Sequence, residues 1–286
     1  MEQKIRQWVD VLGWLVDTLT KVAGSTPTTM TTGLSYSAIT HTGLVRTNNE
    51  DSFVAKSSLG LWVVADGMGG QEAGEVASAI AATTIHKLVS KGNALADAIR
   101  RAHKAVQEAS YHGVGSKGMG TTIVAAQADI QAYEVAWVGD SRAYLWDGQA
   151  LTRLTRDHSL VQELLDAGAI RPDEADSHPQ RHVITQSVGV SGYDEIRVDK
   201  IAGRWELGQW LMLCSDGLTS ELSDTEIADL LATANSPREA TQQLVTAALN
   251  SGGQDNITIE IIAGPEEIQQ GFSLPGLLKR LSGRNA

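Results

Sequence analysis

Three short apolar segments follow one another so closely that they restrict the fold more than any other feature of the chain. Thr121–Ala126, Tyr133–Val138 and Arg142–Trp146 are rich in β-branched or aromatic residues, which favour strands. The turns between them are too short for a crossover helix, which a parallel pair of strands would need. We therefore expect these strands to be antiparallel.

Helical patterns are grouped apart from the strands. Gln71–Val89 and Ala94–Tyr111 are expected to form an antiparallel helix pair. Two more helices, near 224–234 and 237–249, begin at the capping-box patterns of Ser223 with Glu226 and Ser236 with Glu239. Grouped helices beside adjacent strands indicate an α+β layered sandwich. The other expected strands are Leu61–Ala65, Trp210–Cys214 and Asn256–Ile262.

Composition divides the chain into four parts. Residues 1–22 are predicted to form an amphipathic helix, 23–35 a linker rich in Thr, Ser and Gly, 36–264 the main domain and 265–286 a tail. The first part has three interpretations: packing on its own domain, docking to a partner protein or a second copy with Trp14 as an anchor, or binding at a membrane surface.

Charge and cysteine content exclude several classes of protein. The net charge is −11 and no long basic run exists, which argues against a nucleic-acid partner. Cys214, the single cysteine, cannot form an internal disulfide and is expected to lie in the core. The longest apolar run near the N-terminus is too short to span a membrane. We expect a cytoplasmic protein.

Aspartates recur where apolar strands end. Asp66, Asp140 and Asp216 each follow a strand and precede a small residue, while Asp255 stands just before a strand. A single Asp-Gly pair of this kind is usually a turn. Several converging carboxylates, with Asn49-Glu50-Asp51 as a fifth group, would instead suit a hard cation such as Mg²⁺ or Mn²⁺. Both interpretations remain open on pattern alone.

Arg46 lies four residues before Glu50. A lone arginine is normally a solvated surface residue. Beside an acidic metal cluster, its guanidinium could instead bind a phosphate dianion through two parallel hydrogen bonds. Metal ions, a positioned water and an arginine are what hydrolysis of a phosphate ester requires.

These segments together resemble the metal-dependent serine/threonine protein phosphatases of type 2C, in their compact bacterial form. The matching segments occur in family order over about residues 36–264. They are Arg46-Thr-Asn-Asn-Glu-Asp51, Val64-Ala-Asp-Gly-Met-Gly-Gly70 followed by Gly74-Glu75, Gly120-Thr-Thr122, Val138-Gly-Asp-Ser-Arg-Ala-Tyr144, Leu154-Thr-Arg-Asp-His-Ser159, Cys214-Ser-Asp-Gly-Leu218 and Asp255-Asn-Ile-Thr258.

The resemblance implies a four-layer αββα sandwich, with two antiparallel sheets flanked by helix pairs. It implies two tightly bound Mn²⁺ or Mg²⁺ ions and a weaker third. Asp66 is expected to bridge two ions, with the Gly67 carbonyl on the first, Asp216 and Asp255 on the second, and Asp140 with Asp216 on the third. Glu50 and Asp51 are expected to orient metal-bound waters. Arg46 is expected to bind the phosphate, and Asn256 to support the metal ligands without contacting an ion itself.

The implied reaction is hydrolysis of phosphoserine and phosphothreonine in proteins by direct attack of metal-bound hydroxide. The implied partners are phosphorylated proteins and a cognate Ser/Thr kinase. Residues of about 157–189, with a helix from Ser159 to Gly168, resemble a mobile flap beside the site, and His158 would be structural at its base. Met68 replaces a histidine that acts as general acid in eukaryotic members, so a metal-bound water is expected to take that role.

Two other functions remain possible from the sequence. One is a catalytically silent adaptor that acts through residues 1–22. The other is a metal phosphoesterase for small molecules.

Overall fold

The computed structural model describes residues 33–70, 73–175, 178–190 and 195–266. The predicted N-terminal helix, most of the predicted linker and nearly all of the tail lie outside these ranges. The predicted helix Gln71–Val89 is described from Ala73 onward.

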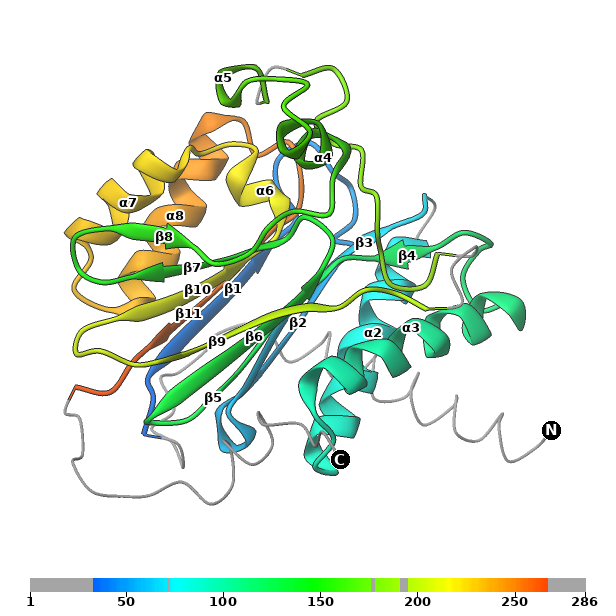
Figure 1. Ribbon diagram of the computed structural model, residues 1–286, viewed down its shortest axis with the longest axis horizontal. Helices are drawn as coiled ribbons and strands as arrows, with labels where there is room; N and C mark the ends of the chain where they lie inside the picture. Colours follow the sequence, from blue (N-terminus) through cyan, green and yellow to red (C-terminus); the bar gives the residue numbers. More distant parts are fainter. Residues whose placement is uncertain (1–32, 71–72, 176–177, 191–194, 267–286) are drawn as a thin grey trace.

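Two antiparallel sheets pack face to face (Figure 1). One has the strand order β1-β11-β10-β7-β8. Its strands are β1 (Tyr36–His41), β11 (Ile257–Ala263), β10 (Trp210–Cys214), β7 (Arg142–Trp146) and β8 (Leu151–Arg153).

The other sheet has the order β2-β3-β5-β6-β9, with the short β4 paired to the end of β3. A 3₁₀ turn, η1 (Ser57–Leu59), connects β2 to β3. The strands are β2 (Asp51–Lys56), β3 (Leu61–Met68), β4 (Gly120–Thr121), β5 (Ile123–Ala128), β6 (Ala132–Val138) and β9 (Asp199–Arg204).

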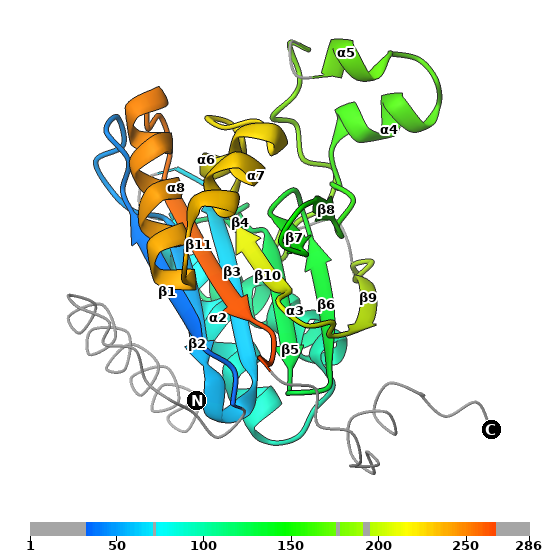
Figure 2. The same cartoon turned by 90° about the vertical axis from the view of Figure 1, so that its left-hand side faces the viewer.

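Helices cover the outer faces of both sheets, as Figures 1 and 2 show from two directions. The antiparallel pair α2 (Ala73–Ser90) and α3 (Leu95–Tyr111) covers the sheet of β3 and β5, while α6 (Asp216–Thr219), α7 (Asp224–Thr233) and α8 (Pro237–Ser251) cover the other. A third apolar cluster, which includes Trp62 and Leu211, fills the space between the sheets. The expected αββα sandwich is confirmed.

Helix caps follow the sequence in one case and depart from it in the other. Ser223 and Glu226 form the predicted capping box at the start of α7. At α8, the Ser236 hydroxyl accepts from the Glu239 amide, but the Glu239 carboxylate accepts from the Asn235 amide and not from that of Ser236. The second capping box is therefore only half formed.

The prediction that three successive strands would be antiparallel to one another is wrong in its last step. β5 and β6 do pair, but β7 pairs with β8 and β10 in the other sheet. Gly139 has φ of +109°, and a Cβ there would lie 2.7 Å from the Thr122 side chain, so only glycine fits this turn. The turn moves the chain from one sheet to the other and leaves Asp140 at the junction.

Between β8 and β9 the chain leaves the sandwich and forms the region that the resemblance calls a flap. It contains α4 (Leu160–Asp166), which begins close to the expected Ser159 but ends two residues before the expected Gly168, and α5 (Pro172–Ala175). The Ser159 hydroxyl caps α4. Both helices stand beyond the strand ends at the top of Figure 1. The two ends of the flap pair with each other, because the Leu160 amide donates to the Val183 carbonyl (2.9 Å) and the Thr185 amide to the His158 carbonyl (2.8 Å).

Within the part of the chain that the structure describes, no helix combines the length and the apolar character needed to cross a lipid bilayer.

Candidate metal centre

Two acidic side chains lie directly opposite each other on neighbouring strands. Asp51, the first residue of β2, pairs with Asp66 of β3. Asp66 was expected just after the end of a strand, but β3 continues through it to Met68. Like charges opposite each other destabilise a sheet, so this pair needs a neutralising partner.

Three more aspartates reach the same place from other elements. Asp140 stands in the turn between β6 and β7, Asp216 begins α6 just after β10, and Asp255 precedes β11. Their charges act on one another: Asp216 raises the pKa of Asp51, Asp66 and Asp140, and Asp255 raises that of Asp216, in each case added to the larger effect of burial. The five predicted carboxylates are therefore one electrostatic cluster.

The donor atoms of this cluster fit a hard cation. All of them are oxygens, and Asp51 Oδ1 and Asp140 Oδ1 are buried without a hydrogen-bond partner. Over the described residues, histidine, cysteine, aspartate and glutamate side chains do not already stand in groups of three or more at metal-binding spacing. The Asp66 and Asp216 carboxyl groups are close enough to act on each other, which adds to the rise that burial causes in the pKa of Asp66 and partly offsets the rise that burial causes in the pKa of Asp216. The chemistry of these donor atoms therefore fits a hard cation.

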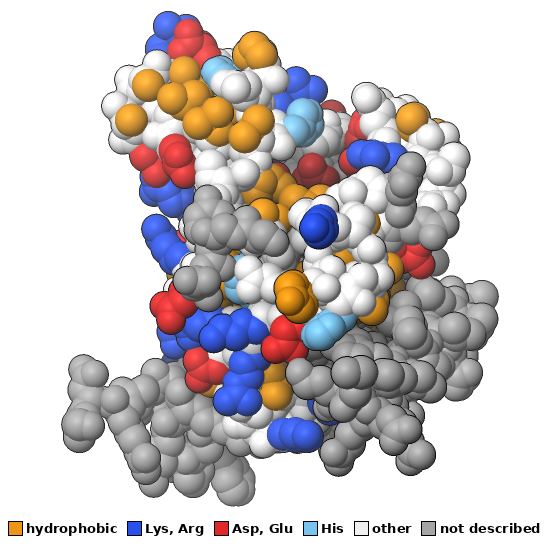
Figure 3. Space-filling model, turned by 90° about the vertical axis from the view of Figure 1, so that its right-hand side faces the viewer, with side chains coloured by type: hydrophobic (Ala, Val, Ile, Leu, Met, Phe, Trp, Pro, Cys, Tyr) orange, Lys and Arg blue, Asp and Glu red, His pale blue; other side chains and the backbone are white. Residues whose placement is uncertain are grey.

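Figure 3 shows where the cluster can be reached. Acidic side chains form the floor of a hollow below the upper lobe, which Figure 1 identifies as the flap. Apolar side chains are spread over that lobe. A ligand that approaches the cluster from this side passes beside the flap.

Arg46 is placed at the edge of the cluster, as predicted. Its Nη2 donates to Asp255 Oδ2 at 2.6 Å, and about half of its side chain is exposed. A cation that also contacts an acidic cluster and remains accessible is placed to bind an anion there.

Asn256 fixes the loop that carries Arg46 and Glu50. Its Oδ1 accepts from the Glu50 amide at 2.7 Å, and its Nδ2 donates to the carbonyls of Thr42 and Asn48, both at 2.9 Å. The side chain is buried. These contacts hold the backbone from Thr42 to Glu50 beside Asp255.

Gly67 lies where three backbone segments meet. A Cβ at this position would lie 2.1 Å from the Gly74 carbonyl oxygen and 2.6 Å from that of Glu50. The Gly67 amide donates to the same Glu50 carbonyl. Any side chain here would push the Glu50 loop and the start of α2 away from Asp66.

Two threonine hydroxyls that were not predicted to have a role hold the Asp66 backbone. Thr121 Oγ1 donates to the Asp66 carbonyl at 2.8 Å, and the Asp66 amide donates to Thr122 Oγ1 at 3.2 Å. Thr122 is bonded in turn to the buried Ser141 hydroxyl. The sequence marked these threonines only as part of the family-like segment Gly120-Thr-Thr122, which does not indicate what their hydroxyls contact.

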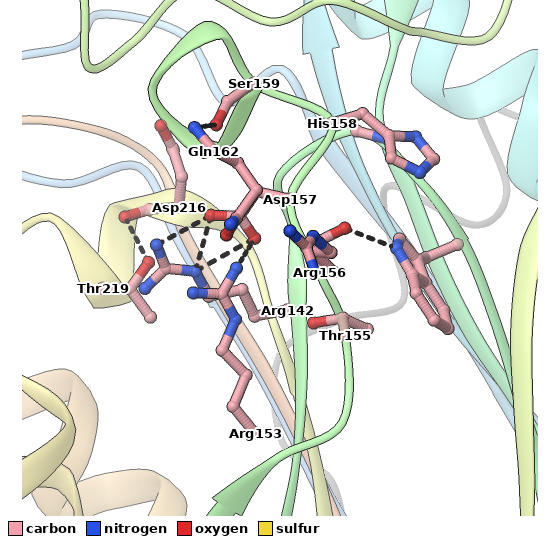
Figure 4. A network of polar contacts seen from close by, with 12 residues as sticks. Arg142, Arg153, Thr155, Arg156, Asp157, His158, Ser159, Gln162, Asp216 and Thr219 are labelled. Carbon is pink, nitrogen blue, oxygen red and sulfur yellow. Dashed lines mark hydrogen bonds and ion pairs between the residues drawn. The ribbon is translucent and has the colours of Figure 1, made fainter. Parts of the chain in front are cut away.

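A second missed feature is a network of charges beneath the flap (Figure 4). Asp157 accepts from Nε and Nη2 of Arg142 and also pairs with Arg153. The carboxylate is nearly buried, with 9% of its side chain exposed. The network therefore ties the start of the flap to β7 and β8.

His158 attaches the same segment to the Asp140 turn. Its Nδ1 accepts from the Gly139 amide at 3.2 Å, and its own amide donates to the Gly139 carbonyl at 2.9 Å. The ring is buried, and Nε2 contacts Asp199. These contacts agree with the structural role predicted for His158. Cys214 is also fully buried, as expected for a core residue.

Comparison with known proteins identifies the family. A sequence profile described as protein phosphatase 2C matches residues 44–251. The chain belongs to the protein phosphatase 2C family. Protein phosphatase PhpP of Streptococcus pneumoniae, a member of similar size, is 38% identical over 248 residues, which cover 82% of this chain and 99% of PhpP.

Solved structures of protein phosphatases agree with this assignment. The serine/threonine phosphatase PstP/Ppp of Mycobacterium tuberculosis superposes with a TM-score of 0.74 at 36% identity, covering 81% of this chain and 99% of that structure. A PstP catalytic domain in complex with two manganese ions superposes with a TM-score of 0.71 at 33% identity, covering 80% of this chain and 97% of that domain. The expected family and enzyme class are confirmed, and the metal dependence expected of the family agrees with the manganese complex.

Proposed function

We propose that this protein phosphatase hydrolyses phosphoserine and phosphothreonine in proteins at the carboxylate cluster, with Mn²⁺ or Mg²⁺ as cofactor. The observation that carries the proposal is the convergence of five aspartates from separate elements, with buried oxygens on Asp51 and Asp140 left unpaired. A divalent cation would neutralise the repulsion within such a cluster and would occupy its unpaired oxygens.

Each residue has a proposed part in holding the ions. Asp66 would bridge two of them, the Gly67 carbonyl would contact the first, and Asp216 with Asp255 would hold the second. Asp140 and Asp216 would hold a weaker third ion. When bound, the ions would lower the pKa of water and neutralise charge that develops on the phosphoryl group.

The remaining residues position the reactants. The Arg46 guanidinium is exposed enough to bind the phosphate through two parallel hydrogen bonds. Glu50 and Asp51 accept hydrogen bonds from waters at the cluster, and the backbone contacts of Asn256 keep the Glu50 loop in place. Water then displaces the serine or threonine oxygen directly, without a phosphoenzyme.

The leaving oxygen needs a proton, and Met68 has none to give. A water at the cluster is the proposed donor. This agrees with the position of Met68, the last residue of β3, two residues beyond Asp66 on the same strand.

The rest of the organisation is proposed on the same basis. Residues 36–264 would be the catalytic unit, with the flap of about 157–189 admitting substrate, and residues 1–22 would dock a partner or a second copy. A cognate Ser/Thr kinase would supply the phosphorylated substrates. We place the protein in the cytoplasm, because a chain with one cysteine forms no internal disulfide and suits a reducing compartment.

Phosphate release from a phosphothreonine peptide tests the function. We expect turnover with Mn²⁺, none after chelation, and none in the Asp66→Asn variant with its fold intact. Phosphotyrosine peptides and nucleotides should be poor substrates, whereas efficient nucleotide hydrolysis would favour a small-molecule phosphoesterase. No Mn²⁺-dependent turnover on any phosphopeptide would favour the silent adaptor, an alternative that the enzyme names of the relatives do not support.

A further inference from the structure

The Asp51 carboxylate is held through one of its two oxygens. Asp51 Oδ2 accepts from Thr258 Oγ1 at 2.6 Å and from Ser215 Oγ at 2.9 Å. Asp51 Oδ1 is buried and has no hydrogen-bond partner. Two hydroxyls on one oxygen prevent rotation of the carboxylate and leave the other oxygen as its only free acceptor.

The Thr258 hydroxyl belongs to a closed ring of hydrogen bonds. The Asp51 amide donates to Asn49 Oδ1 at 3.1 Å, which turns Asn49 Nδ2 toward Thr40 Oγ1 at 2.8 Å. Thr40 Oγ1 and Thr258 Oγ1 are also 2.8 Å apart, and Thr258 Oγ1 returns to Asp51. The ring thus begins at the Asp51 backbone and ends at its side chain.

Each hydrogen in this ring has a single direction. An amide nitrogen can only donate, so Thr40 accepts from Asn49. Thr258 Oγ1 donates its one hydrogen to Asp51 Oδ2, so it accepts from Thr40. A carboxylate that accepts from a hydroxyl makes one of the stronger hydrogen bonds in proteins.

Ser215 reaches the same oxygen independently of the ring. Its Oγ accepts from the Thr258 amide at 2.9 Å, so its hydrogen is free to point at Asp51. The alternative acceptor, the Asn256 carbonyl oxygen, is farther away at 3.4 Å. Ser215 and Thr258 are both almost completely buried.

These contacts connect elements that are distant in sequence. Thr40 on β1 and Thr258 on β11 are paired residues in one sheet, while Asp51 lies on β2 of the other. Asp51 in turn faces Asp66 across the β2–β3 pair. The hydroxyls therefore set the position of a cluster residue from the opposite sheet.

We propose that Thr258 and Ser215 are positioning residues of the phosphatase reaction, which hold Asp51 so that Oδ1 alone faces the carboxylate cluster. There Oδ1 accepts one hydrogen bond from a water in a fixed orientation. This inference rests on the proposed function, because it assigns Asp51 its part in that reaction. Neither hydroxyl contacts substrate directly.

The decisive variant is Thr258→Val, which keeps the shape of the side chain and removes only the hydroxyl. Loss of a residue that supports a metal ligand or its water typically costs about 10–100-fold in activity or metal affinity. We expect kcat for a phosphothreonine peptide to fall by that factor while KM changes by less than about 3-fold, because Arg46 still binds the phosphate.

Two comparison variants separate positioning from packing. Thr258→Ser restores the hydroxyl and should recover kcat. Thr241→Val is the matched control, because Thr241 is also fully buried and bonded to a hydroxyl, that of Ser37 at 2.8 Å, but contacts no carboxylate. Ser215→Ala removes the other hydroxyl on Asp51. It serves as the test variant if Thr258→Val does not fold.

Mn²⁺ binding by titration calorimetry gives a readout that does not depend on turnover. The proposal is supported if Thr258→Val or Ser215→Ala changes kcat or the Mn²⁺ dissociation constant by about 10-fold or more, while Thr258→Ser and Thr241→Val stay within about 3-fold of the wild type. Any other pattern overturns it. A wild-type chain that binds Mn²⁺ without turnover would refute the proposed function and leave this binding test intact.

Discussion

The Arg46 guanidinium and the Asp255 carboxylate form an ion pair, with 2.6 Å between Nη2 and Oδ2. The proposed phosphate-binding residue is therefore bonded to a proposed metal ligand. A cation on Asp255 would compete for that carboxylate and release the guanidinium toward substrate.

Arg46→Ala should raise KM for a phosphopeptide by about 10-fold or more, since hydrogen bonds to charged groups contribute about 1.5–3 kcal/mol. The fall in kcat should be smaller, because the carboxylate cluster is unchanged. Steady-state kinetics at saturating Mn²⁺ measures both. Arg100→Ala, which removes a surface ion pair with Asp97 on α3, is the control. An unchanged KM in Arg46→Ala would show that the phosphate assignment is wrong.

Mn²⁺ should stabilise the protein against heat. The clustered aspartates repel one another in the ligand-free chain, and a ligand that binds only the folded state adds stability. At a Mn²⁺ concentration of about 100 times the dissociation constant, the melting temperature should rise by roughly 5 °C. Differential scanning fluorimetry measures the shift, which Asp66→Asn should largely remove. An equal shift in that variant would place the ion elsewhere.

Asp157→Ala should destabilise the fold by about 3 kcal/mol, because it leaves the Arg142 and Arg153 guanidiniums without their shared carboxylate. Urea denaturation gives the free energy of unfolding. Asp173→Ala is the matched control, since Asp173 pairs with Arg171 at the surface of the same flap. That change should have almost no effect. Similar losses in the two variants would mean that the buried network contributes no more than a surface pair.

Glu260→Met should stabilise the protein increasingly as the pH rises. Glu260 is fully buried on β11, and neither of its carboxylate oxygens has a hydrogen-bond partner. Burial raises the pKa of this carboxyl well above its usual value, and the nearby Val63 backbone lowers it only in part. A raised folded-state pKa means that the contribution of Glu260 to stability is fully present below the unfolded-state pKa of about 4.3 and is lost as pH rises through the folded-state pKa.

The free energies of unfolding of Glu260→Met and the wild type should therefore be similar near pH 4 and separate by about 1–3 kcal/mol at higher pH. Denaturation at a series of pH values measures this difference. Glu134→Met serves as a control, because the Glu134 carboxylate pairs with Lys200. A constant difference between Glu260→Met and the wild type across the pH range would contradict the assignment.

The sequence predicted local elements better than it predicted how they connect. Helix α3 begins one residue after the expected start and ends where expected, and β7 and β10 have the expected bounds. Strand β2 was not predicted, although it carries Asp51. Its residues, Asp51–Lys56, begin within an acidic segment and show no regular apolar alternation.

The step from β6 to β7 marks the limit of pattern analysis. A short turn between two strands indicates a hairpin, and nothing local distinguishes a hairpin from a change of sheet. The change depends on the packing of Gly139 against Thr122, a contact between residues that are far apart in sequence. The same is true of the two hydroxyls on Asp51, which come from Ser215 and Thr258, both more than 160 residues away in the sequence.

The paired ends of the flap have a consequence for how such enzymes diversify. His158, Leu160, Val183 and Thr185 join the two ends to each other, and His158 joins them to Gly139, so the base of the loop is closed whatever lies between. We therefore expect substitutions within residues 167–175 to leave these backbone contacts and the Asp140 turn in place. A loop that is closed at its base in this way should tolerate changes of sequence that the aspartates beside it would not.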